Sequence, residues 1–504
     1  MRIIRTCRDL GIEAVAVYSD ADAGAAHVRA ADAAVRLGPA PAAESYLRAS
    51  AIIEAARETG AQAIHPGYGF LSERASFARA AEEAGIVFVG PSADAIEALG
   101  DKLAARRTAR DADVPVVPGT YDAVGDGGPD AVADVIDVAE RIGFPLMVKA
   151  AAGGGGRGMR RVERAEDLPA ALIAASAEAR SAFGDGSIYL EREVRPARHI
   201  EVQLLGDHAG TVVALGERDC SVQRRHQKLV EESPAPGLTT AERQTLHGLA
   251  IRAARAASLY NAATAEFLFD EDRRFWFLEV NARLQVEHGV TELITDLDLV
   301  TEQLWIAAGD PLSEGVEKAA AAIASGIERH AIEVRLSAED PSRDFAPAPG
   351  RIGRWSMPSG PGVRVDTAVE AGERIAPDYD PLIAKIMTMG SDRKTAIKRM
   401  RRALDEVVVT GIQTTLSFDI ALMRDTAFRE GELSTGFVGE HWEPETSRAK
   451  ALEVARRGAA YVAKQTGAGP NEGAIQGASL RKDGDVETPW RQAARTDAID
   501  RWPR

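Results

Sequence analysis

The first ninety residues alternate between stretches with apolar residues at helical spacing and short apolar runs. Helical spacing occurs twice, at Ile3, Ile4, Cys7 and Leu10 and again at Ile52, Ile53 and Ala56. The strand-like runs AVAVY and IVFVG follow these two stretches. This alternation predicts βαβ units with a parallel sheet. The chain nevertheless begins with a helix, whereas a βαβ unit has a strand before its helix, so we expect one strand of this sheet to be missing.

A smaller unit extends from Val114 to about Glu193. Its strand-like segments are VPVVPG, FPLMVKAA and SIYLERE, and the alanine-rich stretch 165–180 is predicted to be helical. Beyond this unit, polar and apolar residues alternate with period two in HIEVQLLGD, TVVALGERD, ATAEFLF and FWFLEVNARL. Such alternation is typical of half-buried antiparallel strands and predicts the largest domain. After about residue 445 the pattern is lost, and GAGPNEGAIQGA resembles a linker or a loose tail.

Length and composition limit the class of protein. A chain of 504 residues suggests about three domains. Its 45% hydrophobic and 27% charged residues are ordinary for a soluble globular protein, and no apolar run approaches the ~20 residues that span a bilayer. The N-terminus lacks the apolar core of a secretory signal, and Cys7 and Cys220 are too few for a disulfide framework or a zinc site. We therefore expect a cytoplasmic protein that spans no membrane.

The net charge of -15 and the lack of a basic stripe with aromatic residues argue against a nucleic-acid surface. One segment, RRHQK, is locally basic, although charge runs are usually solvated loops. A site that handles several anions together would need such cations. Those that could supply this field are Lys102, Lys149, Lys228, Arg283 and Arg335.

The glycine run GGGGRGMR, Gly153 to Arg160, follows the predicted strand that ends in Lys149. Such a loop can place backbone N–H groups against phosphates, but a glycine-rich hairpin tip explains a bare glycine run equally well. Lys149 favours the phosphate interpretation. The run does not match the P-loop spacing, and no G-x-G-x-x-G opens a helix after a strand with an acid about 20 residues further on, so we expect nucleotide binding of another kind.

A stronger pattern lies in two neighbouring strand-like segments. Period two places Glu279, Asn281 and Arg283 on one strand face, and Glu266 lies in the neighbouring segment. Carboxylates among apolar neighbours are costly to bury unless they are paired or bound to a metal. Two carboxylates and an amide oxygen suit Mg²⁺, whereas solvated strand faces with salt bridges would be the ordinary alternative. For the set as a whole we favour the metal.

Five segments together resemble the biotin carboxylases of the ATP-grasp superfamily: HPGYGFLSE, KAAAGGGGRGMR, ERDCSVQRRHQK, EVNARLQVEH and HAIEVRLSAEDP. They lie in the family's order and spacing, and the similarity covers roughly residues 1–442. EVNARLQVEH distinguishes biotin carboxylases from most other ATP-grasp ligases. The resemblance implies an α/β and α+β protein with an ATP-grasp fold, in which an N-terminal parallel-sheet domain is followed by a mobile central lid and a large C-terminal antiparallel-sheet domain.

The resemblance also implies domain boundaries. These are 1–100 for the N-terminal domain, 101–193 for the first ATP-grasp portion with the lid at about 115–190, 194–325 for the second portion, 326–442 for the C-terminal domain and 443–504 for a tail of unknown role.

By the same resemblance, the chain binds ATP, bicarbonate and Mg²⁺, with Mn²⁺ as an alternative. Contacts to ATP would come from Lys102, Lys149, Gly154, Gly155, Gly156, Glu191, Val194, His199, Gln223 and His226. The metal ligands would be Glu266, Glu279 and Asn281, in agreement with the strand-face argument. Bicarbonate would lie among Lys228, Arg283, Gln285, Val286 and Glu287.

The implied reaction is ATP-dependent carboxylation of biotin through carboxyphosphate. Glu287 would be the base that deprotonates bicarbonate, with Lys228 and Arg283 as cationic catalytic residues, and Arg335 would bind biotin and stabilise its enolate. Breakdown of carboxyphosphate would yield CO₂ and a phosphate that deprotonates the ureido nitrogen.

Two alternatives to this reaction remain. The first is another ATP-grasp ligase, either carboxylating or carbamoyl-phosphate-forming, against which RRHQK and QVEH speak. The second is a non-catalytic assembly subunit. Intact Glu287, Lys228 and Arg335 argue against it.

Three departures from the family pattern bear on partners. The strand and glycine-containing turn that usually precede the first helix are absent, so we expect a miscalled start at Met1 or a truncation. No Met-Lys-Met biotinylation site follows residue 442, so biotin would arrive on a separate biotin carboxyl carrier protein, and a carboxyltransferase subunit would take the carboxyl group onward. The tail is the third departure. The resemblance further implies a homodimer and an acyl-CoA carboxylase of the acetyl- or propionyl-CoA type, as in fatty acid biosynthesis.

Overall fold

The computed structural model describes residues 1–124, 129–151, 159–326 and 328–445, together with 449 and 456. These residues form two compact units. The first unit comprises 1–333, 389–396 and 431–440, and the second comprises 334–388, 397–430 and the described residues from 441 onward. No helix of the described part is long and apolar enough to cross a membrane.

The first unit begins with alternating helices and short parallel strands, as the apolar pattern predicts. Its elements are α1 (Arg2–Asp9), β1 (Val15–Ser19), α2 (Ala26–Ala30), β2 (Ala33–Gly38), α3 (Ala49–Thr59), β3 (Ala63–Ile64), α4 (Ala75–Glu83), β4 (Val87–Phe88), α5 (Ala93–Gly100) and α6 (Lys102–Asp111). Strand β1 pairs with β2, and β3 pairs with β4, both in parallel. The predicted parallel pairing is therefore confirmed, although IVFVG contributes only the two-residue strand β4.

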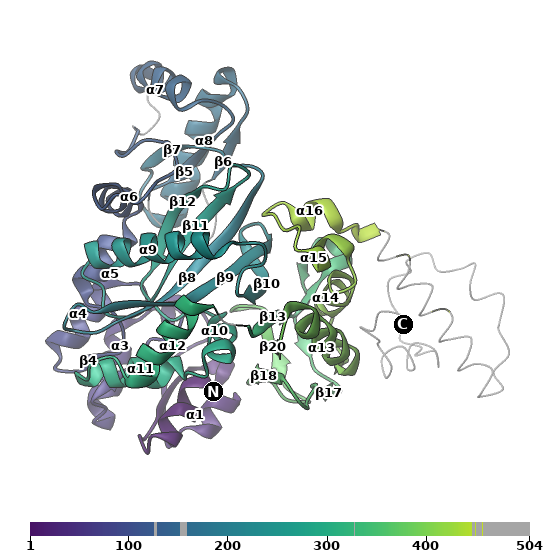
Figure 1. Cartoon of the computed structure of the whole chain (residues 1–504). Coiled ribbons are helices and arrows are strands. Elements are labelled where there is room, and N and C mark those ends of the chain that lie inside the picture. The colour runs from purple at the N-terminus through teal and green to yellow at the C-terminus, as the bar shows by residue number, and fades with distance from the viewer. Residues whose placement is uncertain (125–128, 152–158, 327, 446–448, 450–455, 457–504) are drawn as a thin grey trace, which may run out of the picture. The chain divides into compact units, whose positions relative to one another are not determined.

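A small antiparallel sheet with two helices follows (Figure 1). Its elements are α7 (Pro129–Ile142), β5 (Leu146–Ala150), β6 (Arg160–Val162), α8 (Leu168–Phe183) and β7 (Ile188–Arg192). The strand order is β6-β5-β7, and Leu146, Leu172 and Leu190 are part of its apolar core. The strand predicted at VPVVPG is wrong: only single bridges form there, because Pro115 and Pro118 have no N–H to donate to a ladder.

The largest sheet of the first unit is antiparallel. It is built from β8 (Ala197–Gly206), β9 (Val212–Arg224), β10 (Gln227–Ser233), β11 (Asn261–Asp270) and β12 (Phe275–Asn281) in the order β12-β11-β8-β9-β10. Helix α9 (Thr240–Ala256) packs on one face (Figure 1). Helices α10 (His288–Thr295), α11 (Leu299–Ala308) and α12 (Glu314–Ser325) contact strands β9 and β11 as well.

The alternation of polar and apolar residues correctly locates these strands but misleads about their burial. On β8, Ile200 and Val202 belong to the same apolar core as Leu246 of α9. The polar residues between them, such as Glu201 and Gln203, are also fully buried. The strands are therefore not half-buried, because paired polar groups fill the second face.

The chain beyond α12 supplies most of the second unit and a few segments of the first. The elements of this stretch of chain are β13 (His330–Ser337), β14 (Glu339–Asp340), β15 (Ala346–Pro347), β16 (Gly350–Arg351), β17 (Trp355–Ser356), β18 (Val363–Thr367), β19 (Arg374–Ile375), β20 (Leu382–Gly390), α13 (Arg393–Glu406), β21 (Val408–Val409), α14 (Leu416–Leu422), α15 (Thr426–Glu430) and α16 (Phe437–His441). Strands β18 and β20 are antiparallel, as expected for this part of the chain.

Candidate active site

A row of charged residues crosses four neighbouring strands of the large sheet. Arg218 on β9 is the register partner of Glu201 on β8, which is opposite Glu266 on β11, which in turn is opposite Glu279 on β12. Residues directly opposite one another in a sheet project from the same face. The Arg218 guanidinium forms a buried ion pair with Glu201. Three carboxylates are thus placed side by side next to a single buried arginine.

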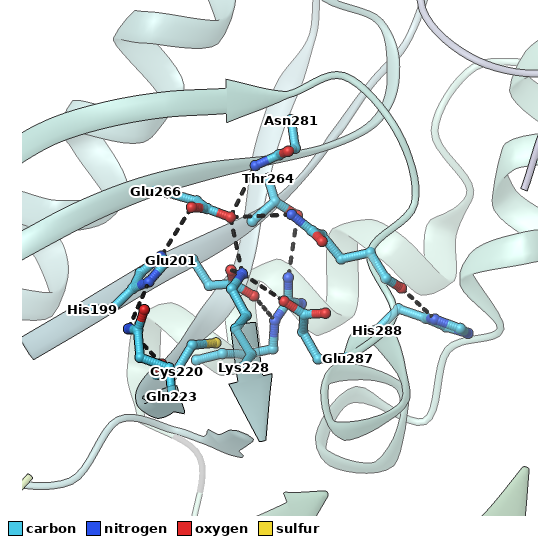
Figure 2. Close-up of polar contacts among 12 residues, drawn as sticks. His199, Glu201, Cys220, Gln223, Lys228, Thr264, Glu266, Asn281, Glu287 and His288 are labelled. Atoms are coloured by element: carbon cyan, nitrogen blue, oxygen red, sulfur yellow. Dashed lines mark hydrogen bonds and ion pairs between the residues drawn. The ribbon is translucent and has the colours of Figure 1, made fainter. Parts of the chain in front are cut away.

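Lys228, from the start of β10, reaches into this row (Figure 2). Its Nζ lies 2.5 Å from Glu201 Oε2, 2.9 Å from Glu266 Oε1 and 2.7 Å from Glu287 Oε1. Burial alone lowers the pKa of Lys228, but the charges of Glu201 and Glu266 outweigh it and raise this pKa well above its usual value. Lys228 is therefore a cation at neutral pH and cannot serve as a base.

Glu266 and Glu279, the two acids predicted to bind metal, respond differently to the same surroundings. Burial raises the pKa of Glu266, but Lys228 and His199 outweigh this effect and hold the pKa well below its usual range. Burial and the neighbouring charge of Glu266 both raise the pKa of Glu279. A divalent cation between two such adjacent carboxylates would relieve their repulsion.

The oxygen atoms of the three predicted metal residues are of the chemical kind that binds Mg²⁺. Asn281, also predicted, donates from Nδ2 to Glu266 Oε1 at 2.9 Å. Carboxylate and amide oxygens are hard ligands of the kind that Mg²⁺ prefers. Two further groups of potential ligands are buried in the same region: His199, Glu201 and Glu266, and Glu201, Cys220 and Glu287.

The segment after β12 brings an arginine to the same place. Arg283 donates from Nη2 to Asn281 Oδ1 and from Nη1 to Gln285 Oε1, both at 2.9 Å. Gln285 Nε2 in turn donates to Glu266 Oε1 at 3.2 Å. The predicted bicarbonate residues Arg283, Gln285 and Glu287 are thus gathered around Lys228, and Val286 lies between the last two in sequence.

Glu287 is the N-cap residue of α10 and is completely buried. Its Oε1 accepts from Lys228, and Figure 2 shows the carboxylate pointing toward that ammonium. A carboxylate at a helix N-terminus is stabilised by the helix dipole. The Glu287 carboxylate is therefore a buried proton acceptor beside a charged lysine.

Histidine and glutamine side chains border the row on the β8 and β9 side. His199 Nε2 lies 3.0 Å from Glu266 Oε2, and Gln223 Nε2 lies 3.4 Å from His199 Nδ1. Burial lowers the pKa of His199, but Glu266 outweighs it and raises the pKa above its usual value. His226 lies apart from this contact, exposed in the turn that joins β9 to β10, with a left-handed φ of 65°.

The predicted ATP residues of the small sheet form a second cluster. Glu191 on β7 is buried and is ion-paired with Lys149 on β5 and with Arg106 on α6. Burial raises the pKa of Glu191, but Lys149 and Arg106 outweigh burial and bring the pKa below its usual value. Lys102, at the start of α6, acts electrostatically on both Glu191 and Glu279.

Three other predictions have different outcomes. Val194 is half-buried in the loop that follows β7. Gly154, Gly155 and Gly156 lie outside the described residues. Arg335 is on β13 in the second unit, where its backbone carbonyl accepts from Thr415 Oγ1 at 3.0 Å.

Sequence reasoning missed Glu201 and Arg218 as members of the cluster, together with Thr264. Arg218 Nη2 donates to Thr264 Oγ1 at 3.1 Å and Nη1 donates to Gln203 Oε1 at 2.8 Å. The signal was present in HIEVQ, because period two places His199, Glu201 and Gln203 on one face of an otherwise apolar strand. Arg218 has no such signal, since its neighbours along the chain are also polar.

Three family descriptions match successive parts of the chain. Residues 1–96 match "Biotin carboxylase, N-terminal domain", residues 101–315 match "Carbamoyl-phosphate synthase L chain, ATP binding domain", and residues 333–440 match "Biotin carboxylase C-terminal domain".

Individual relatives cover most of the chain. Biotin carboxylase 1 of Bacillus subtilis is 46% identical over 442 residues, which is 87% of this chain and 95% of that protein. Among solved structures, the biotin carboxylase domain dimer of Hydrogenobacter thermophilus 2-oxoglutarate carboxylase, in complex with MgADP, ADP and bicarbonate, has a TM-score of 0.83 at 43% identity, covering 87% of this chain and 94% of that one. The biotin carboxylase portion of a pyruvate carboxylase has a TM-score of 0.72 at 42% identity, covering 87% of this chain and 95% of that one.

Proposed function

Because the chain belongs to the biotin carboxylase family, we propose that the cluster around Lys228 is the place where bicarbonate is bound and activated. The enzyme is an ATP-dependent ligase that carboxylates biotin, using ATP, Mg²⁺ and bicarbonate. The observation that carries the site assignment is the contact of one permanently charged lysine with three buried carboxylates next to Arg283.

The residues of the cluster have different roles according to their charge. Lys228 and Arg283 attract bicarbonate and balance its negative charge, and Glu287 accepts its proton. The deprotonated oxygen then attacks the γ-phosphorus of ATP, so that ADP leaves and carboxyphosphate forms. Glu266, Glu279 and Asn281 would hold Mg²⁺, which supplies neutralisation of the phosphate charge. Lys149 and Lys102 lie at the second cluster, where they would bind ATP phosphates.

Biotin receives the carboxyl group in the second stage. Carboxyphosphate breaks down to CO₂ and phosphate, the phosphate removes the ureido proton, and the nitrogen attacks CO₂. Arg335 stabilises the enolate formed in this step. His199, Gln223 and His226 with Glu191 and Val194 are proposed to surround the nucleotide, together with the glycine loop.

We further propose that biotin arrives on a separate carrier protein, that a carboxyltransferase subunit uses the product, and that the chain forms a homodimer in the cytoplasm. The comparison with a biotin carboxylase domain dimer supports the last assembly. The related chains belong to enzymes with different final acceptors, so we assign acceptor choice, whether acetyl-CoA or another acyl-CoA, to the carboxyltransferase partner.

The test measures ADP release by the purified chain with Mg²⁺ and bicarbonate, with and without free biotin. We expect biotin to stimulate ADP release and Glu287→Gln to abolish this stimulation, because an amide cannot accept the bicarbonate proton. Glu271→Gln, an exposed acid between β11 and β12, is the matched control and should behave as wild type. ADP release that needs bicarbonate but ignores biotin would instead favour a carbamoyl-phosphate-forming or other carboxylating ligase.

A further inference from the structure

The side chain of Arg283 is held by three side-chain acceptors, one on each of its nitrogens, and by one backbone carbonyl. Two of the side-chain acceptors, Asn281 Oδ1 and Gln285 Oε1, are its neighbours along the chain, and the Leu284 carbonyl accepts from Nη1 at 3.4 Å. The third side-chain acceptor is Glu73, whose Oε2 accepts from Arg283 Nε at 2.8 Å and which lies 210 positions away in the N-terminal part of the first unit. Since a guanidinium is planar, acceptors at all three nitrogens fix both its position and its plane.

Without the third acceptor, the surroundings of Arg283 would draw it elsewhere. Burial lowers its pKa, but Glu73, Glu287 and Glu266 outweigh burial and raise the pKa. Glu287 and Glu266 already bind Lys228, so an arginine released from Glu73 would be attracted toward that buried charge. Glu73 is the acidic partner that lies outside the Lys228 cluster, and its contact opposes that attraction.

Glu73 is itself placed by an ordered loop. Between β3 and α4, His65 Nδ1 accepts from the Gly67 backbone N–H at 3.1 Å, and His65 Nε2 lies 3.2 Å from Gln303 Oε1 on α11. Further along, the Ser72 backbone N–H donates to the Gly69 carbonyl at 3.0 Å. These contacts order the backbone that leads to Glu73, while the Glu73 side chain is 39% exposed and its carboxylate accepts from Arg283.

We propose that Glu73 is a positioning residue for bicarbonate: it orients Arg283 so that the one guanidinium N–H not used by acceptors in the described part of the chain, the second N–H of Nη2, faces the substrate. The proposal rests on the proposed function, in which Arg283 contacts bicarbonate. Through Glu73, the N-terminal part of the chain would thus influence the affinity for bicarbonate. The effect on ATP should be smaller, because the lysines proposed to bind its phosphates lie at the Glu191 cluster and Glu73 acts on the proposed metal ligand Glu279 only through its charge.

The experiment is steady-state ADP release in the full chain, with bicarbonate and ATP varied separately. We expect Glu73→Ala to raise the KM for bicarbonate about tenfold while the KM for ATP changes less than about twofold. Glu73→Gln, which keeps an acceptor oxygen but loses the charge, should fall between wild type and Glu73→Ala. Glu83→Ala, which removes an exposed acid at the end of α4, is the matched control and should leave both constants unchanged.

A double variant separates positioning from general damage. Arg283→Lys removes Nε and the planar fork, so adding Glu73→Ala to it should raise the KM for bicarbonate by less than about a further twofold. Full additivity, an unchanged KM for bicarbonate in Glu73→Ala, or equal changes for both substrates with a lower melting temperature would each overturn the proposal. A wild-type chain without bicarbonate-dependent ADP release would overturn the proposed function itself, and this inference with it.

Discussion

Arg335 is the half-buried residue of β13, whose other positions are buried. A charged side chain at the accessible position of an otherwise buried strand is available to a ligand at lower desolvation cost than its neighbours would be. We expect Arg335→Ala to lower biotin-dependent ADP release at least about a hundredfold, because a charge-stabilising donor contributes roughly 3 to 4 kcal/mol to a transition state. Near-normal turnover would contradict the role. Arg351→Ala, an exposed arginine of the same unit, is the control.

The sequence predicted which residues belong to the cluster around Lys228 better than it predicted which of them contact one another. The period-two argument correctly joined Glu279, Asn281 and Glu266, because alternation decides which side chains share a face. It could not reveal that Glu201 would stand in register with Glu266, since register depends on which strands become neighbours. The contact of Glu73 with Arg283 was equally invisible, because Glu73 lies in a loop 210 positions away in the chain.

Helix α9 begins with a complete capping box, and its apolar side covers the face of the sheet opposite the charged row. The Thr239 hydroxyl accepts from the Glu242 backbone N–H at 3.3 Å, and the Thr239 backbone N–H donates to Glu242 Oε2 at 2.7 Å. We expect Thr239→Ala to lower the free energy of unfolding by about 1 kcal/mol and to leave ADP release unchanged.

Chemical denaturation monitored by circular dichroism measures this effect. Thr245→Ala is the matched control, because Thr245 lies inside α9 and its hydroxyl donates to the Ala241 carbonyl without capping the helix. A loss in Thr239→Ala no larger than that in Thr245→Ala would show that the cap does not stabilise the helix. A loss of activity at unchanged stability would show that α9 affects the site directly.

Elements with a clear period were predicted correctly, and those whose backbone chemistry opposes the pattern were not. The four long strands β8, β9, β11 and β12 follow the alternation of the sequence. VPVVPG has strand-like side chains, but its prolines prevent a ladder. The predicted half-burial of these strands was also wrong. The pattern alone does not show that helices cover the polar face, or that ion pairs offset the cost of burying it.

Acid should destabilise the folded chain through its buried carboxylates. Burial raises the pKa of Glu232, but His330 and Arg393 outweigh it and lower the pKa from 4.5 to about 2. A depressed folded-state pKa contributes stability above the unfolded value, and this contribution is lost as pH falls from about 4.5 toward about 2. For Glu232 alone it is on the order of 3 kcal/mol.

Urea unfolding at a series of pH values from about 6 to about 3 tests this expectation. The free energy of unfolding should fall as the pH drops through this range, and Glu232→Gln should be less stable at the upper end but show a shallower decline. Glu217, buried beside His247 and Arg243, also has a lowered pKa and should add to the slope in both proteins. An equal decline in wild type and Glu232→Gln would exclude Glu232 as a source.

For the molecule as a whole, the sequence predicted the order of the parts: a parallel α/β start, a small sheet with helices, and a large antiparallel sheet. Local patterns and the family resemblance sufficed for this order, although the parallel start and the large sheet share one apolar core and the small sheet has another. The domain boundaries at 193 and 326 and the role of 443–504 stay predictions. No local pattern specifies them, since they depend on contacts between distant segments.

The row from Arg218 to Glu279 also has a consequence for how preparations of this enzyme can be judged. If one strand slipped by a single residue during folding, its charged side chain would turn under α9 and its apolar residues would turn into the site. The same molecule would then lose both its apolar packing and its charged row, so it would be inactive and not merely less active. Turnover per mole of chain therefore counts correctly registered molecules, and a preparation of low specific activity is expected to be a mixture of competent and inert copies.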